Sequence, residues 1–396
     1  MSFQDLQTRF DAHVLPTYAR YPVAFIRGQG CRLYDVEGKE YIDFASGIGV
    51  CSVGHAHPRW VAAIAEQAGR LAHVSNLYYS EPGMVLAERL CALSGMSGAF
   101  FANSGAEANE GAIKAARKYS SDKYGVGRAV VVTLEGSFHG RTLATLSATG
   151  QAQFHRHFHP LPAGFQHVPP GDIAAIRQLD GSVCAVMLEP VQGEGGVLPL
   201  DPEYVRQVEA LCRERDWVFI ADEVQTGIGR TGHWFAHQAM GVAPDIVTFA
   251  KGIAGGLPLG GFLVSEKLRG ALGPGDHATT FGGTPLCCAA ALATLDILAE
   301  ALPAVAEKGA LIRARVEGMG LPQVAGTRGM GLMIGIKLVG AAPRDWNAKL
   351  LAAGLVSLTA GSDALRFLPP LVIGEQDIEA GLTIFENTLR VNTIDN

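Results

Sequence analysis

The sequence predicts an α/β protein with a mostly parallel central sheet. The middle of the chain alternates short apolar segments with helix patterns, and most of the apolar segments lack polar alternation, as strands covered on both faces should. The intervening segment 201–215 starts with an acid and a proline and ends in arginines, which is typical of a helix. The expected strands cover residues 129–134, 183–188, 217–222, 246–249 and 261–265.

The length of 396 residues predicts more than one domain, because single cores stop growing at roughly 250–300 residues. We expect a large domain over residues 51–301 and a smaller α+β domain over residues 302–396. The N-terminal segment 1–50 should contribute to the smaller domain, since residues 20–45 read as short strands around turns, with a hairpin turn at residues 35–38.

Composition excludes several classes of function. The net charge is −6 without runs of like charge, which argues against a nucleic-acid partner and a polybasic membrane anchor. No secretory signal is visible, and the most apolar stretch (286–306) contains Asp296 and Glu300, so it predicts a buried helix. Seven cysteines without CxxC spacing indicate reduced thiols, and we expect a cytoplasmic protein.

A capping box opens an alanine-rich helix at Ser104-Gly105-Ala106-Glu107. A helix N-terminus with small side chains offers free N–H groups to a phosphate. Capping alone would also explain the pattern, so the motif leaves both interpretations open.

An acid, Asp222, ends the expected strand 217–222, at the edge where open α/β sheets bind ligands. The following Gly227, Gly229 and Gly232 match GxGxxG, which raises the alternative of an NAD(P)-dependent oxidoreductase. A dinucleotide fingerprint needs its turn directly after the strand, whereas here four residues intervene. We therefore disfavour this alternative.

Further polar residues follow other expected strands. Phe138 and His139 offer a flat face, and Arg141 offers a planar fork suited to a carboxylate. Glu189 and Glu194 lie on a glycine-rich loop. The histidines at 155, 157 and 159 could share one face, but no acid or cysteine is close in sequence, so we expect a solvated loop and no metal site.

A single lysine, Lys251, ends the apolar run 246–250 and precedes a series of glycines. Alone it would be an ordinary strand-end lysine. Together with Asp222, Ser104 and Phe138 it supplies what pyridoxal phosphate (PLP) needs: a Schiff-base lysine, an acid for the pyridine nitrogen, a phosphate cradle and a stacking face. The glycines would then let the backbone pass close to that cofactor.

Eight segments, in this order and spacing, resemble one enzyme family over nearly the whole chain. The sequence is similar to class III (ω-amino acid) PLP-dependent aminotransferases, and within them to the acetylornithine and succinylornithine aminotransferases. The segments are GHAHP (54–58), NSGAEANE (103–110), FHGRT (138–142), EPVQGEGGV (189–197), DEVQTGIGRTG (222–232), AKGIAGGLPLG (250–260), TTFGGTP (279–285) and RFLPPLVI (366–373).

This resemblance implies the PLP-dependent transferase fold type I and a set of cofactor contacts. Lys251 would hold the cofactor's aldehyde and later shuttle a proton, and Asp222 would pair with the pyridine nitrogen. The remaining implied contacts are Ser104, Gly105 and Ala106 with Thr280 of a second subunit at the phosphate, Phe138 and Val224 on the two ring faces, and Gln225 at the ring hydroxyl.

The resemblance also implies how substrates bind. Arg141 would bind the α-carboxylate of an ornithine-type donor, and Tyr21 would belong to the same substrate site. Glu194 and Arg366 would form a gating ion pair that opens for 2-oxoglutarate or glutamate.

The implied activity is ping-pong transfer from N-acetylornithine to 2-oxoglutarate, in arginine biosynthesis or catabolism, by a homodimer with its active site at the subunit interface. Thr284 stands where the family more often has asparagine, and KGIAGG (251–256) leans toward 4-aminobutyrate aminotransferases. Donor choice therefore stays open among 4-aminobutyrate, ornithine, succinylornithine and acetyl-lysine.

Overall fold

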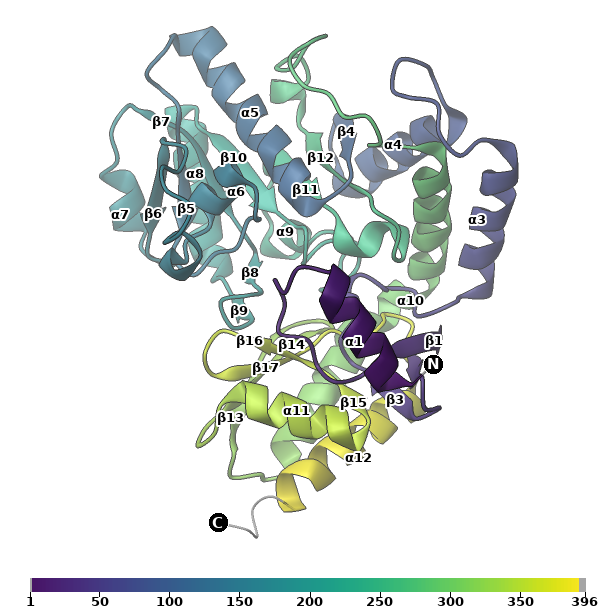
Figure 1. Cartoon of the computed structure of the whole chain (residues 1–396). Coiled ribbons are helices and arrows are strands. Elements are labelled where there is room, and N and C mark those ends of the chain that lie inside the picture. The colour runs from purple at the N-terminus through teal and green to yellow at the C-terminus, as the bar shows by residue number, and fades with distance from the viewer. Residues whose placement is uncertain (1, 392–396) are drawn as a thin grey trace.

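The computed structural model describes residues 2–391 and is built around one large sheet (Figure 1). Its strand order is β4-β12-β11-β10-β7-β5-β6. Strand β12 runs antiparallel to both of its neighbours, and the other neighbouring pairs are parallel, which confirms the predicted mostly parallel sheet. The strands are β4 (Gly98–Ala102), β5 (Val130–Leu134), β6 (Phe165–Val168), β7 (Val183–Leu188), β10 (Val218–Asp222), β11 (Ile246–Phe249) and β12 (Gly260–Val264).

Both faces of this sheet are covered, which explains why its strands lack polar alternation. In β7, Ala185 and Met187 belong to a core cluster that includes residues of α5, whereas Val186 and Leu188 belong to a cluster that includes residues of α8. Every residue of β7 is buried. The helices of this part of the chain are α5 (Gly105–Tyr124), α6 (Leu143–Ala148), α7 (Ile173–Arg177), α8 (Pro202–Arg215) and α9 (Ala236–Met240).

A second lobe contains both ends of the chain (Figure 1). One of its sheets has the order β1-β2-β3-β15, and β15 runs parallel to β3, so a C-terminal strand extends an N-terminal hairpin. The other sheet has the order β13-β14-β17-β16 and is antiparallel. The strands are β1 (Phe25–Gln29), β2 (Arg32–Asp35), β3 (Glu40–Asp43), β13 (Val324–Met330), β14 (Met333–Leu338), β15 (Leu355–Val356), β16 (Leu358–Ala360) and β17 (Ala364–Phe367).

The turn predicted at residues 35–38 connects β2 to β3. The Gly38 N–H donates to the Asp35 carbonyl at 3.1 Å, and Gly38 has a φ of +85°, a left-handed conformation that glycine adopts readily. The helices of this lobe are α11 (Pro343–Ala353) and α12 (Glu375–Val391), and α1 (Phe3–His13) lines a cavity together with residues of α11 and β15.

The longest helix, α10 (Pro285–Gly318), connects the two lobes. It packs against α3 (Pro58–Arg70) and α4 (Glu81–Ser94) at one end and against β13, β14 and α12 at the other. Its length and composition would suffice to span a membrane, but residues such as Cys288, Leu295 and Ile312 are buried in the main core. It is a core helix, as the polar residues in its sequence predict, and the domain boundary expected at residue 301 falls inside it.

The remaining described elements are short connections. They are α2 (Ser46–Gly49), the 3₁₀ turns η1 (Ala152–Phe154), η2 (Lys251–Ala254) and η3 (Glu266–Leu268), and the strand pair β8 (Val191–Gln192) and β9 (Leu198–Pro199). Parallel strands end at the same edge of the sheet, so the loops after β5, β7, β10 and β11 meet there. This edge holds most of the residues that the sequence singles out.

Candidate active site

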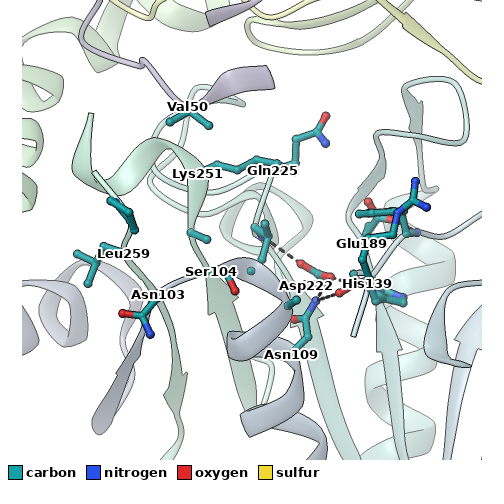
Figure 2. A pocket seen from close by; sticks show the side chains of 18 of the residues that line it. Val50, Asn103, Ser104, Asn109, His139, Glu189, Asp222, Gln225, Lys251 and Leu259 are labelled. Carbon is teal, nitrogen blue, oxygen red and sulfur yellow. Dashed lines mark hydrogen bonds and ion pairs between the residues drawn. The ribbon is translucent and has the colours of Figure 1, made fainter. Parts of the chain in front are cut away.

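A cavity of about 410 Å³ opens at this edge of the sheet. It is lined by residues from the loops after β4, β5, β7, β10 and β11, which converge in Figure 2. Nine of the thirteen residues predicted for the site line it: Ser104, Gly105, Ala106, Phe138, Arg141, Asp222, Val224, Gln225 and Lys251.

The Asp222 carboxylate accepts four hydrogen bonds at the base of this cavity. Its Oδ2 lies 2.7 Å from His139 Nδ1 and accepts from Asn109 Nδ2 at 2.8 Å. Its Oδ1 accepts from the Val224 N–H at 3.1 Å and from Thr248 Oγ1 at 3.2 Å. Burial raises the pKa of Asp222, but the bond from His139, its charge and the other donors outweigh burial, so the net pKa is lowered. The side chain is therefore ionised although only 3% exposed.

Two of these partners, His139 and Asn109, have a function that the sequence pattern does not indicate. His139 was expected to offer a flat face, and it instead directs Nδ1 at Asp222. Asn109 was not singled out; it also donates to the His139 carbonyl at 2.7 Å (Figure 2). The available signal was a polar residue among the buried alanines of α5, since a buried amide needs partners.

Lys251 opens the η2 turn directly after β11 and has a φ of +42°. Positive φ is rare for a residue with a Cβ and indicates local strain, which is concentrated at functional sites. Burial lowers the pKa of the Lys251 ammonium, while the charge of Glu194 acts in the opposite direction. No carboxylate among residues 2–391 lies within ion-pair distance of Nζ. A larger fraction of the Lys251 side chain is therefore neutral amine than in an exposed lysine.

The N-terminus of α5 faces the cavity through three small residues. Ser104 Oγ accepts from the Glu107 N–H at 3.2 Å, and Glu107 Oε2 accepts from the Asn103 N–H at 2.6 Å, so the box closes one residue earlier than the sequence predicts. The N–H groups of Gly105 and Ala106 precede the first helical hydrogen bond and are open to a ligand. Phe138 and Val224 also line this space.

Glu189 is a second buried carboxyl beside Asp222. It accepts from the Phe138 N–H at 2.9 Å and from the Gly193 N–H at 3.4 Å. Burial raises its pKa to about 7, although the charge of His139 lowers it. Two neighbouring carboxyls therefore differ in charge near neutral pH, with Asp222 ionised and Glu189 partly protonated.

An ion pair lies behind Gln225. Arg366 Nη1 donates to Glu194 Oε1 at 2.6 Å and to Gln225 Oε1 at 3.0 Å. Arg366 is 3% exposed. Burial raises the pKa of Glu194, but the charge and hydrogen bond of Arg366, the charge of Lys251 and the hydrogen bond of Gln225 together outweigh burial, so the net pKa of Glu194 is lowered. Neither Glu194 nor Arg366 lines the cavity directly, and Gln225 connects them to it.

The remaining two predicted residues, like Glu194 and Arg366, do not line the cavity of this chain. Thr280 is exposed on the loop between β12 and α10, which is compatible with its predicted contact with a second subunit. Tyr21 lines a separate cavity beside α1, where its hydroxyl accepts from Asn347 Nδ2 at 2.6 Å. The structure does not bring Tyr21 to Lys251.

The histidines at 155, 157 and 159 and the GxGxxG glycines do not line this cavity. Within residues 2–391 no group of three or more metal-ligating side chains occurs, and His155 Nε2 lies 2.8 Å from the Thr149 carbonyl. Gly227, Gly229 and Gly232 do not line the cavity. They belong to a turn whose carbonyls and N–H groups bond within the loop, with Gly227 N–H donating to the Glu223 carbonyl at 2.9 Å.

The glycines after Lys251 serve mainly to make room for the protein itself. A Cβ on Gly255 would lie 2.5 Å from Trp60 Nε1, and one on Gly261 would lie 2.2 Å from the Phe100 carbonyl oxygen of the adjacent strand. Gly256 alone of this group lines the cavity. Close packing of β12 and η2 thus explains most of this pattern.

Comparison with known proteins identifies the family. The model of the family "Aminotransferase class-III" matches residues 15–389. The chain is a class III aminotransferase. Such enzymes depend on PLP, and this aminotransferase therefore uses PLP as well.

Named relatives of this class III aminotransferase are similar over nearly their full length. The acetylornithine aminotransferase of Haemophilus ducreyi is 48% identical, covering 95% of this chain and 96% of the relative. That of Methanocaldococcus jannaschii is 45% identical, with 95% of each chain covered.

Solved structures agree with the fold. The ornithine aminotransferase of Toxoplasma gondii superposes with a TM-score of 0.95 at 30% identity, covering 100% of this chain and 97% of that one. The N-acetylornithine aminotransferase of Stenotrophomonas maltophilia superposes with a TM-score of 0.85 at 35% identity, covering 98% and 100%.

The residues of the cavity fit PLP. A pyridinium needs an acid that stays ionised when buried, and the four donors on Asp222 provide this. A phosphate needs open N–H groups, which the start of the 20-residue helix α5 offers. A flat ring needs apolar walls, and Phe138 and Val224 line the space in which Lys251 also lies.

Proposed function

We propose that this aminotransferase moves the distal amino group of N-acetylornithine to 2-oxoglutarate in two half-reactions. The names of its relatives support this donor. The observation that carries the proposal is that one cavity combines Lys251, the buried Asp222 carboxylate and the guanidinium of Arg141, with the Glu194–Arg366 pair directly behind it. A lysine and an ionised acid suit the chemistry, and the two arginines suit two carboxylate-bearing substrates.

PLP, when bound, supplies an electron sink for the negative charge that develops on the substrate carbon. The Asp222 carboxylate would favour a proton on the ring nitrogen, because its charge is stabilised by four donors and lies out of water. Lys251 Nζ takes up and returns the substrate proton; a lowered pKa increases the fraction of the neutral amine that can act as a base. Phe138 and Val224, which line the cavity, would contact the ring and exclude water from it.

Substrate choice rests on the two arginines. Arg141 binds the α-carboxylate of the donor at the open side of the cavity. Arg366 is neutralised by Glu194 while the donor, whose distal end is uncharged apart from the reacting amine, is bound. When 2-oxoglutarate enters, its carboxylate takes the place of Glu194 on Arg366, so one site accepts both substrates in turn.

The assembly belongs to the same proposal. We infer a homodimer in which Thr280 of one subunit reaches the phosphate site of the other, and an enzyme of arginine biosynthesis or catabolism in the cytoplasm. The exposed position of Thr280 supports the dimer. Sedimentation of the purified protein tests whether it is a dimer. Thr280→Ala should weaken PLP binding if Thr280 reaches the phosphate site of the other subunit.

A donor panel tests the substrate. The purified protein should be yellow, and borohydride should fix the cofactor covalently on Lys251. N-Acetylornithine should bleach the visible band faster than ornithine, 4-aminobutyrate, succinylornithine or acetyl-lysine, and 2-oxoglutarate should restore it. A faster reaction with another donor would replace N-acetylornithine in the proposal, and a colourless protein that ignores added PLP would overturn it.

A further inference from the structure

The Arg141 guanidinium lies at the open side of the cavity without an acidic partner. Arg141 is exposed, and among residues 2–391 no carboxylate lies within ion-pair distance of it. Instead, its Cζ lies 4.1 Å from the centre of the Phe154 ring and 5.5 Å from the centre of the Phe138 ring. The charge is thus held by aromatic faces and not by an anion of the protein.

The position of Phe154 is fixed relative to the site. Phe154 ends the η1 turn and is half-buried, with its ring centre 6.1 Å from that of Phe138 at an interplanar angle of 82°. The segment before it is tied to the buried Ser137: the Gly150 N–H donates to Ser137 Oγ at 3.0 Å, and Gln151 Nε2 donates to the Ser137 carbonyl at 3.1 Å. The loops that carry Phe154 and Phe138 therefore form one unit.

We propose that Phe154 is a positioning residue for substrate recognition, whose ring holds Arg141 ready to bind a carboxylate. The inference rests on the proposed function, because it assigns the carboxylate to the amino donor. A guanidinium that lies against a ring uses its face, so the N–H donors on its edge stay free for a bidentate bond with both oxygens of a carboxylate. Phe154 itself does not line the cavity.

Loss of the ring should weaken carboxylate binding without affecting the cofactor. Arginine has many rotamers, and without the ring the guanidinium would spend less time in the binding position. We expect Phe154→Ala and Phe154→Leu each to raise the KM for N-acetylornithine about tenfold, and Phe154→Tyr to stay within about twofold of the wild type, because tyrosine retains an aromatic face. The value of kcat and the visible spectrum should change little.

A binding measurement separates this inference from the activity. The holoenzyme is titrated with glutarate, a five-carbon dicarboxylate without an amino group, by calorimetry. Phe154→Leu should weaken glutarate binding about tenfold in the wild-type background and have no further effect in Arg141→Ala. Phe158→Ala, which changes an exposed phenylalanine of the same segment, is the matched control and should leave binding unchanged.

A second experiment uses an amino donor that lacks the α-carboxylate. N-Acetylputrescine equals N-acetylornithine without the α-carboxylate, so Phe154→Leu should leave its slow bleaching of the visible band unchanged. Equal losses with both amines, or an undiminished effect of Phe154→Leu in Arg141→Ala, would overturn the inference. If the wild type prefers another donor, the proposed substrate fails, while the glutarate cycle still decides the function of Phe154.

Discussion

Two charged clusters flank Lys251, and they differ in how many hydrogen bonds hold the carboxylate of each, although both contain buried atoms without a partner among the described residues, such as Asn109 Oδ1 and His139 Nε2 in the first. In the Asp222 cluster (Asp222, His139, Asn109 and Thr248), both carboxylate oxygens accept two bonds each. In the Arg366 cluster (Arg366, Glu194 and Gln225), Nη1 alone donates to both partners, and Nε has no partner among the described residues. The Glu194 side chain is also 30% exposed.

This difference indicates which parts of the site are fixed. A carboxylate with four donors cannot turn without leaving buried groups unpaired, so the Asp222 cluster is rigid. An arginine held by one nitrogen and a partly exposed glutamate can exchange partners at lower free energy. Under the proposed function, the protein builds the cofactor side in advance and leaves the Arg366 cluster, which we propose binds the second substrate, able to rearrange.

Replacing Lys251, which lies between the clusters, should have the largest effect. Lys251→Ala should lower kcat by about 10³-fold or more, because it removes the proton-transferring amine and the covalent attachment point. The measurement is steady-state turnover, with borohydride labelling followed by peptide mass analysis. The control Lys349→Ala, at an exposed helix position, should retain wild-type turnover. Full activity of Lys251→Ala would show that another group transfers the proton.

Removing the negative charge of the Asp222 cluster should have the next largest effect on turnover. Asp222→Asn should lower kcat by about 10²- to 10³-fold, the range found when one stabilising group of a transition state is lost. Thr248→Val removes only one neutral donor and should lower kcat less than tenfold. The comparison of both variants, each loaded with PLP, checks the ranking. Similar losses would mean that geometry and not charge is the decisive property.

Glu189, the buried carboxyl beside Asp222, should make the free energy of unfolding depend on pH. Its folded pKa of about 7 exceeds its ordinary value of 4.5. Between these values the unfolded form loses its proton while the folded form keeps it, so the free energy of unfolding falls as the pH rises through this window. Glutamine cannot ionise, so the free energy of unfolding of Glu189→Gln should not show this fall. The difference in the free energy of unfolding, variant minus wild type, should therefore be up to about 3 kcal/mol larger at pH 8 than at pH 4.

Urea unfolding of both proteins at these two pH values measures the difference. Glu214→Gln, at an exposed position of α8, is the matched control and should follow the wild-type pH dependence. Parallel curves for Glu189→Gln and the wild type would show that folding does not raise the pKa of Glu189, and that the charge difference between the two neighbouring carboxyls near neutral pH does not exist.

A substitution in the Arg366 cluster should change activity least, and it should affect the two substrates differently. Glu194→Gln leaves the positive charge of Arg366 without its counter-ion, which should repel the distal ammonium of the donor and favour a dicarboxylate. We expect the ratio of kcat/KM for N-acetylornithine to that for glutamate to fall about tenfold, which corresponds to about 1.4 kcal/mol. An unchanged ratio would refute the exchange of partners on Arg366.

Much of the cofactor side could be predicted from the sequence, because its residues follow strands whose apolar runs are distinct. The sequence predicts strands at residues 217–222 and 246–249, and the observed strands are β10 (Val218–Asp222) and β11 (Ile246–Phe249). Each predicted end therefore lies within one residue of the observed end. Parallel strands then place their loops at one edge. The capping box was visible for the same reason, since it is a local pattern.

The rest depends on contacts between distant segments. Asn109 and His139 are 30 residues apart, and nothing local indicates that both reach Asp222. The position of Tyr21 depends on how the N-terminal segment lies against residue 347, which periodicity does not determine. The fit of the glycines after Lys251 against Trp60 and Phe100 likewise appears only once the tertiary packing is known.

The parallel pairing of β3 with β15 has a consequence for synthesis on the ribosome. Ile42 pairs with Leu355, so the N-terminal hairpin must wait for a strand made roughly 300 residues later before its sheet is complete. The strands of the large sheet are all translated earlier, between residues 98 and 264. The sheet that carries Asp222 can therefore form while the nascent N-terminal strands still have an open edge, which is the stage at which a chaperone would protect this chain.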